Sequence, residues 1–254
     1  MGLWERLAFI APFNSGSSAG GHTMFDANGS PHGSLTAGST LQWRGTPYGL
    51  GVGISGASNL LYQDNFAPIT SSNGTYTGDV SAVCLANPIA EARSSILLSQ
   101  GPTGGSLNIA ANPADVSGRL RVNIGLTGPN VNGVIDGKYH LFGGVRAGTV
   151  NTTYLDGIAV ATQTAAGESI GGALAGLALG NSAEATTNRI DTACNIVFAA
   201  AWNRALTAAE MWLLARDPFI MFRPIARQKI YYIPAAGGAD VRKKIISAYT
   251  RIAA

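Results

Sequence analysis

The sequence has 254 residues, of which 46% are hydrophobic and 12% charged, with a mean hydropathy of +0.16. This length and apolar content suffice for one large β domain and do not fit an intrinsically disordered chain. The formal charge is uneven, because residues 1–215 sum to −3 and residues 216–254 to +6. This asymmetry favours a basic C-terminal segment that meets an acidic partner, nucleic acid or another subunit.

The first residues are apolar, but the run is too short for a signal peptide. Glu5 and Arg6 interrupt it, and no small-residue cleavage pattern follows. The whole sequence has no uninterrupted apolar run of about 18 residues, so it predicts no membrane span. We expect residues 1–20 to form an N-terminal arm with a few anchoring side chains: Leu3, Trp4, Leu7, Phe9 and Ile10.

A series of short β-prone runs begins near residue 48, separated by turn pairs such as Gly-Pro, Asn-Gly and Asp-Gly. The 33 glycines are spread through the chain, which indicates many tight turns. Such a pattern is typical of a sandwich or jelly roll, so we predict an all-β fold, an antiparallel β-sandwich over residues 21–234. The predicted strands are Tyr48–Ile54, Asp79–Leu85, Ser94–Ser99, Ser106–Ala110, Arg119–Gly125, Lys138–Arg146, Thr149–Leu155, Ile158–Gln163, Ala173–Leu179 and Cys194–Trp202.

One short helix is predicted near the C-terminal end of this domain, over about 208–215. Thr207 and Glu210 form a capping-box pattern, in which the side chain of each satisfies a backbone donor of the other. Leu206 and Met211 are placed to form a hydrophobic staple across the cap. An Asp-Pro pair then ends the helix, because the residue before a proline is driven out of the helical region.

Residues 235–254 are predicted to form a C-terminal arm after a Pro-Ala-Ala-Gly-Gly hinge. Apolar residues recur at helical spacing among basic ones, and an isolated helix of this length orders only by docking on something. We expect the arm to dock on a neighbouring subunit through Arg242, Lys243, Lys244, Ile245, Ile246 and Tyr249. The alternatives are a solvated, disordered end and a nucleic-acid contact. Nucleic acid is disfavoured because no stacking aromatics are interleaved with the basic residues.

The two cysteines, Cys84 and Cys194, are too few for a disulfide framework and lie in strand-like runs. We predict two buried free thiols, with one disulfide between neighbouring strands as the alternative.

Several motifs between residues 136 and 224 resemble the concanavalin A-like (laminin-G-like) lectin/glucanase family. The Asp156-Gly157 pair in one of them is also a physical turn signal, because a type I′ turn needs positive φ at both central residues. The chain departs from the family at residues 191–196, where the acidic pair of the usual Gly-x-Ile-Asp-Glu stretch is missing. The motifs are Asp136–Gly143 (the family's G-x-W/Y-H strand), Thr153–Val160 (its L-Y-V-D-G hairpin), Leu177–Asn181 (its L-x-I-G strand) and Trp202–Met211 (its Y-N-R-A-L-S-x-x-E-I ending).

Glycoside hydrolases of this fold use a Glu-x-Asp-x-x-Glu strand to supply nucleophile and acid, and the sequence has no such triplet. We therefore predict a protein that is not an enzyme and carries no cofactor. Ordinary turn or strand roles are expected for the three histidines, because no metal-ligand spacing accompanies them: His22, His32 and His140.

Two further sets of residues have a structural interpretation and a functional alternative. Turn or strand-end roles are expected for three carboxylates, with calcium binding as the alternative: Asp64, Asp79 and Asp156. Core packing is expected for three aromatic residues, with stacking on a sugar as the alternative: Trp43, Tyr48 and Tyr62.

The segment Asp217–Pro224 resembles the ending of such domains in bacteriophage virion proteins. With the basic tail, this resemblance favours a non-enzymatic decoration protein of a bacteriophage particle, associated with capsid or tail. Its arms would dock on other virion proteins and on copies of itself. The alternative is a carbohydrate-binding adhesion module that recognises host-surface glycans. Neither nucleic acid nor a membrane is an expected partner.

Overall fold

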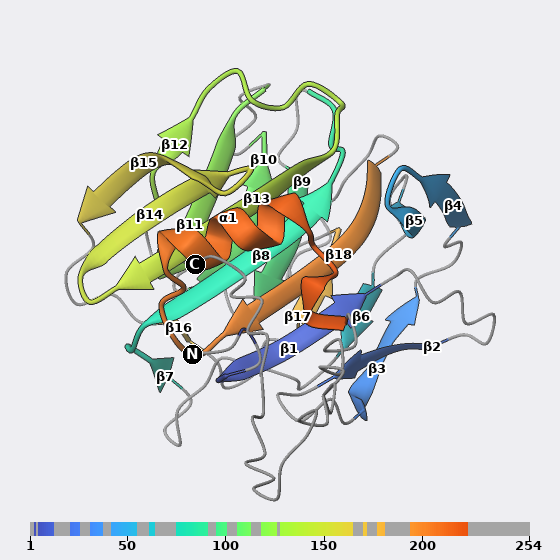
Figure 1. Ribbon diagram of the computed structural model, residues 1–254, viewed down its shortest axis with the longest axis horizontal. Helices are drawn as coiled ribbons and strands as arrows, with labels where there is room; N and C mark the ends of the chain where they lie inside the picture. Colours follow the sequence, from blue (N-terminus) through green and yellow to red (C-terminus); the bar gives the residue numbers. More distant parts are fainter. Residues whose placement is uncertain are drawn as a thin grey trace, which may run out of the picture.

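The computed structural model describes most of the chain from residue 3 to residue 222 (Figure 1). The described residues are 3, 5–12, 21–25, 31–37, 42–54, 61–63, 75–90, 95–100, 106–112, 118–125, 128–164, 170–171, 177–180 and 194–222. The predicted C-terminal arm, 235–254, lies outside them, as does the docking set Arg242, Lys243, Lys244, Ile245, Ile246 and Tyr249.

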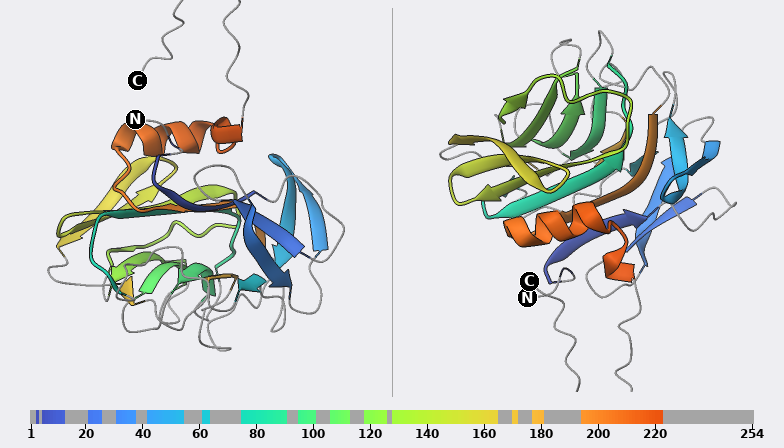
Figure 2. Two further views of the ribbon diagram at one scale, coloured as in Figure 1. Left: turned by 90° about the horizontal axis from the view of Figure 1, so that it is seen from below. Right: turned by 45° about the horizontal axis from the view of Figure 1, so that its top comes forward.

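Sixteen strands of the described chain form one antiparallel sheet that folds back on itself into two layers (Figures 1 and 2). The predicted all-β sandwich is therefore confirmed. The layer beneath the helix contains, in spatial order, β1 (Leu7–Pro12), β18 (Cys194–Trp202), β8 (Val80–Ala86), β13 (His140–Ala147), β14 (Val150–Leu155) and β15 (Ile158–Thr164).

The opposite layer contains β12 (Asn130–Val131), β11 (Leu120–Gly125), β10 (Ser106–Ala111), β9 (Ser95–Gln100), β17 (Leu177–Leu179) and β6 (Leu61–Gln63). The strands β3 (Pro31–Ala37) and β2 (Gly21–Phe25) join the two layers. The hairpin of β4 (Gln42–Thr46) and β5 (Gly49–Ile54) pairs with β18, while β7 (Thr75–Tyr76) and β16 (Ile170–Gly171) form a separate small sheet.

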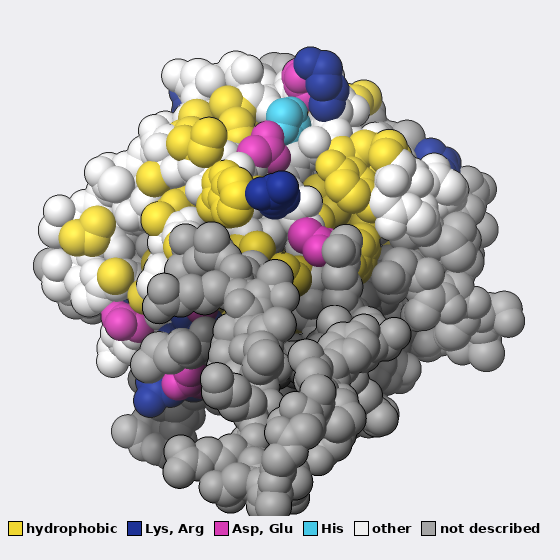
Figure 3. Space-filling model, viewed as in Figure 1, with side chains coloured by type: hydrophobic (Ala, Val, Ile, Leu, Met, Phe, Trp, Pro, Cys, Tyr) yellow, Lys and Arg dark blue, Asp and Glu magenta, His cyan; other side chains and the backbone are white. Residues whose placement is uncertain are grey.

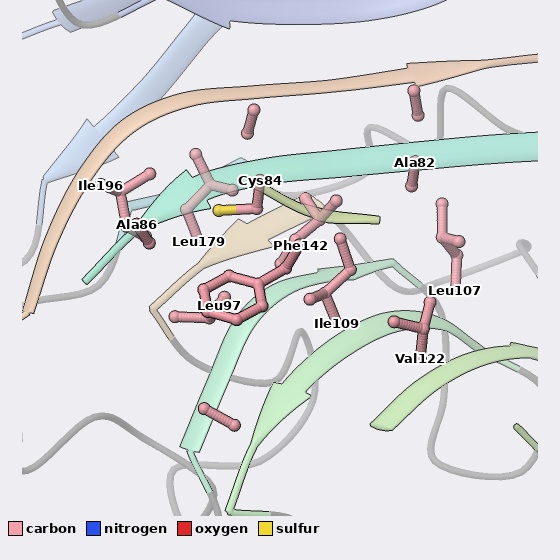
Figure 4. Close-up of a cluster of buried hydrophobic side chains, with 14 of the residues drawn as sticks. Ala82, Cys84, Ala86, Leu97, Leu107, Ile109, Val122, Phe142, Leu179 and Ile196 are labelled. Atoms are coloured by element: carbon pink, nitrogen blue, oxygen red, sulfur yellow. The ribbon is translucent and has the colours of Figure 1, made fainter. Parts of the chain in front are cut away.

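The core lies between the two layers, and its side chains come from alternate positions of the strands. In β8, Ala82, Cys84 and Ala86 face the opposite layer, where they meet side chains such as Leu97 and Ile109 (Figure 4). Burial of such aliphatic side chains contributes about 1.5–3 kcal/mol each. The interior between the layers is therefore the main source of the fold's stability.

A second apolar cluster lies on the other face of the same strands, beneath α1 (Ala208–Arg216). Val83 and Leu85 of β8 belong to this cluster, together with Met211 and Leu214 of the helix. Because both of its faces are covered, β8 is a continuous buried run and not an alternating one. The helix is followed by a 3-10 turn, η2 (Ile220–Phe222).

The helix begins and ends as the sequence predicts. The Thr207 side chain accepts a hydrogen bond from the Glu210 amide at 3.2 Å, and the Glu210 carboxylate accepts one from the Thr207 amide at 2.9 Å. Arg204 adds two hydrogen bonds to the same carboxylate, at 2.7 and 2.9 Å. This pair ties the end of β18 to the first turn of the helix.

One part of the predicted N-terminal arm is wrong. Residues 7–12 are strand β1, which pairs with β18 on one side and β2 on the other. The Leu3 and Glu5 carbonyls also accept hydrogen bonds from the Trp202 and Arg204 side chains, at 2.6 and 3.0 Å. The segment is therefore an inner strand of the sheet, between β18 and β2, a role that its local sequence pattern does not indicate.

Two smaller predictions are confirmed. Cys84 and Cys194 are fully buried thiols that form no disulfide. Burial, reinforced by the neighbouring Cys194, raises the pKa of the Cys84 thiol well above its usual value. Asp156 and Gly157 have φ of 50° and 78°, as the β14–β15 turn requires. No helix within the described ranges has the length and apolar character needed to cross a membrane.

Candidate binding site

A strip of polar side chains crosses the face of the molecule that carries α1. The strip consists of Asp136, Lys138, His140 and Asp156, from the loop before β13, the first residue of β13 and the β14–β15 turn. The His140 ring is central, because its Nδ1 lies 2.6 Å from Asp156 Oδ2 and its Nε2 lies 3.1 Å from Asp136 Oδ1. We call these four residues the polar strip.

The charged groups of the polar strip contact one another directly. The Lys138 ammonium and amide both donate to the Asp136 carboxylate, at 2.8 and 2.9 Å, and together with His140 they hold the pKa of that carboxyl far below its usual value. Asp156 also accepts a hydrogen bond from the Leu141 amide at 2.9 Å. The strip therefore presents two carboxyl groups, an exposed ammonium group and an imidazole that contact one another.

Trp212 lies beside one end of the strip. It is on the outer side of α1 and is 50% exposed, whereas Met211 next to it is fully buried. A Cβ atom on Gly157 would lie 2.6 Å from the Trp212 Cα atom, so the helix backbone rests directly on the turn that holds Asp156. The Arg216 guanidinium lies 5.3 Å from the centre of the Trp212 ring, in the range of a cation–π contact.

Two tyrosines contact each other beside the strip. Tyr48, in the β4–β5 turn, is 38% exposed, and its ring meets that of Tyr139 edge-on at 5.7 Å. Tyr139 sits between Lys138 and His140 in the chain, and burial raises the pKa of its hydroxyl. Figure 3 shows the result on this face: a histidine beside acidic side chains, with hydrophobic side chains gathered on both sides.

We call the polar strip together with Trp212 and Tyr48 the helix-side site. It combines exposed aromatic faces, which bind apolar surface, with carboxylate acceptors and cationic donors at fixed spacing. Such a combination suits a ligand that has both C–H faces and many hydroxyl groups. The positions are rigid, because both the Asp156-Gly157 turn and α1 are fixed by the core beneath them.

The structure places some of the residues that the sequence analysis singled out. Tyr48 is exposed rather than part of the core, so its expected packing role is wrong. Asp79 and Asp156 take turn roles, because each accepts a backbone hydrogen bond, from Gly148 at 2.7 Å and from Leu141 at 2.9 Å. Asp64 and the side chains of His22, His32, Trp43 and Tyr62 lie outside the described residues.

Within the described part of the chain, no group of three or more His, Cys, Asp or Glu side chains is arranged to hold a metal ion. The expectation of no cofactor, and the calcium alternative, stay predictions. His140 takes the strand role expected for it, as the first residue of β13, and its ring contacts two carboxylates.

The helix-side site was not predicted, although the sequence carries one signal for it. In the helix, Met211 and Leu214 mark the buried side, and Trp212 lies about 100° away from Met211 around the axis. A large aromatic residue off the buried side of an amphipathic helix is a candidate surface contact. The approach of Asp156 to His140 depends on the pairing of β13 with β14 and has no such local signal, whereas Asp136 is only four residues from His140.

No protein-family model and no curated protein matches this sequence. Solved structures match its fold. They share its β-sandwich fold. The receptor binding domain of botulinum neurotoxin D is 7% identical with a TM-score of 0.62, and the binding domain of Paraclostridial Mosquitocidal Protein 1 is 11% identical with a TM-score of 0.61. Each match covers 86% of this chain and 54% of the other.

A Trypanosoma rangeli sialidase is similar at 14% identity with a TM-score of 0.57. That match covers 84% of this chain but 33% of the sialidase. The chain therefore spans a third to about half of the length of these structures, and the likeness concerns the fold.

Proposed function

We propose that this chain is a non-enzymatic binding module that takes a carbohydrate at the helix-side site. The observation that carries the proposal is the half-exposed Trp212, whose backbone lies against the turn that presents Asp156, which in turn contacts His140. An indole ring offers a flat apolar surface for the C–H face of a sugar ring, and the neighbouring carboxylates accept hydrogen bonds from its hydroxyls. The binding domains among the structural neighbours support a binding role.

The proposal of a non-enzyme rests on the carboxylates of the described residues. Glu210 bonds Arg204 and the Thr207 amide, and therefore holds the helix in place instead of facing a ligand. Asp136 and Asp156 are kept apart by the His140 ring, to which both bond. This arrangement supports binding of a glycan without cleavage.

A glycan array followed by titration calorimetry on the strongest hit tests the carbohydrate proposal, with and without calcium. Loss of the Trp212 ring should weaken binding at least tenfold, as expected for a central aromatic contact. The matched control is Val150→Ala, which removes a 40% exposed hydrophobic side chain at the far end of β14. An array without hits, or a hit that Trp212→Ala binds unchanged, would overturn the proposal.

Mass spectrometry of the bound glycan should return it intact, and cleavage products would contradict the non-enzymatic role.

We further propose that the module is carried on a bacteriophage particle, where the exposed sandwich would meet host glycans. The support is the resemblance of Asp217–Pro224 to virion-protein endings and the basic segment 235–254. Removal of residues 235–254 should abolish incorporation into particles while leaving the thermal melting of the sandwich unchanged. Normal incorporation of the shortened chain would refute the docking role of the arm.

A further inference from the structure

Strand β15 lies at one end of the sheet order. It pairs with β14 along its whole length, and in the described part of the chain no strand pairs with its other edge. Figures 1 and 2 show it at the outer margin of the layer beneath α1. An edge of this kind presents a row of backbone donors and acceptors that another strand can pair with.

The side chains of β15 do not protect this edge. The strand reads Ile-Ala-Val-Ala-Thr-Gln-Thr, without a charge or a proline, and six of its seven residues are exposed. Natural edge strands usually carry lysine, proline or an inward-pointing charge against unwanted pairing. Of the six large exposed hydrophobic residues in the described chain, half belong to the β14–β15 hairpin: Val150, Ile158 and Val160.

One protective device is present, and it limits where pairing can occur. The register between β14 and β15 shifts between Thr153 and Tyr154, which indicates a bulge near Val160. Beyond it, Ala161 to Thr164 pair regularly with β14. This half of the strand offers a straight edge of four residues.

We propose that β15 pairs antiparallel with β15 of a second copy of this chain through the Ala161–Thr164 half. An identical copy fits because the strand is uncharged, so two copies bring no like charges together, and because a two-fold axis lets both edges pair at once. An edge contact of this size is well below the roughly 1,200–2,000 Å² of a standard stable interface. The dimer should therefore be weak and depend on concentration.

The pairing has a geometric consequence for binding. Antiparallel strands of one continuous sheet are related by a two-fold axis perpendicular to the sheet, so both copies keep the same face on the same side. Since α1 covers one face of this layer, the two helix-side sites would point the same way. A dimer of this kind would bind a surface that displays repeated ligands with higher avidity than a monomer.

Sedimentation velocity across a concentration series tests the pairing. The test variant is Thr162→Lys, which places a charge on an exposed edge position, and the control is Ala90→Lys, an exposed loop position outside the hairpin. The wild-type chain and the control should form dimers at about 100 μM, whereas Thr162→Lys should stay monomeric. The dissociation constant of the Thr162→Lys dimer should be at least tenfold higher than that of the wild-type dimer. If Thr162→Lys lowers the melting temperature, Gln163→Lys serves as a second edge variant.

A wild-type chain that stays monomeric, or dimers that both edge variants leave intact, would overturn the inference. The outcome is separable from the carbohydrate proposal, because the affinity for a monovalent sugar should be the same in the wild-type chain and in Thr162→Lys.

Discussion

Substitution of Gly157 by alanine tests how tightly α1 is held on the β14–β15 turn. Gly157 has φ of +78°, and the left-handed conformation costs a residue with a Cβ atom about 1–2 kcal/mol. The new methyl group would also lie 2.6 Å from the Trp212 Cα atom and 2.9 Å from the Met211 carbonyl oxygen. Both are backbone atoms, so the helix must shift, and overpacking of this kind costs about 1–3 kcal/mol.

The sum is a destabilisation of about 2–5 kcal/mol, to be measured as the free energy of unfolding in urea. Gly148→Ala is the matched control, because Gly148 has φ of +58° in the β13–β14 turn and a Cβ atom there would meet nothing within 4 Å. The control should lose only the conformational part, about 1–2 kcal/mol. Equal losses in the two variants would refute the close contact between the helix and the turn.

Three other measurements address the core and the helix cap. Glu210→Gln should lower stability at neutral pH by about 2–4 kcal/mol, because it leaves the buried Arg204 without its carboxylate. Burial raises the pKa of Glu210, but the hydrogen bonds from Arg204 and Thr207 outweigh it and lower that pKa below 4.5. The stabilisation by the Arg204–Glu210 pair is therefore complete above about pH 4.5 and is lost as the pH falls further. The acid-induced loss of stability should accordingly be smaller in Glu210→Gln than in the wild-type chain. Equal dependence of stability on pH in the two proteins would contradict the role of this pair. Ser81→Ala should lower the free energy of unfolding in urea by about 1–3 kcal/mol. The reason is that the buried hydroxyl donates to the Arg204 carbonyl at 2.9 Å and accepts from the Leu206 amide at 2.8 Å. An unchanged free energy of unfolding would mean that neither hydrogen bond contributes to stability. Cys84 and Cys194 should not react with a thiol reagent in the folded protein and should both react in denaturant; rapid labelling under native conditions would show that the core opens.

Local patterns predicted much of this fold. The strand Cys194–Trp202 has the predicted bounds, and most of the other predicted strands from β5 onward differ from the observed ones by one or two residues. The helix was predictable because its start is a local motif, with Thr207 and Glu210 three residues apart. These signals depend only on neighbours in the chain.

Residues 7–12 show what local patterns leave out. Nothing near Leu7 in the chain indicates that the segment lies between β18 and β2, because that position is set by pairing with residues 198–202. The helix-side site is similar, since His140 meets Asp156 only after β13 and β14 have paired. Contacts between distant residues decided both features.

The bonds between the first and last parts of the sandwich have a consequence for synthesis of the chain. The Leu3 carbonyl and the Trp202 indole are 199 positions apart, and so are Glu5 and Arg204. During translation the β13–β14–β15 meander can form as soon as it leaves the ribosome, because its pairings are local. β1 must wait for β18, and until then the backbone edge of β1 that pairs with β18 has no partner strand. A nascent chain stalled before residue 194 should therefore be the species that chaperones bind and proteases cut.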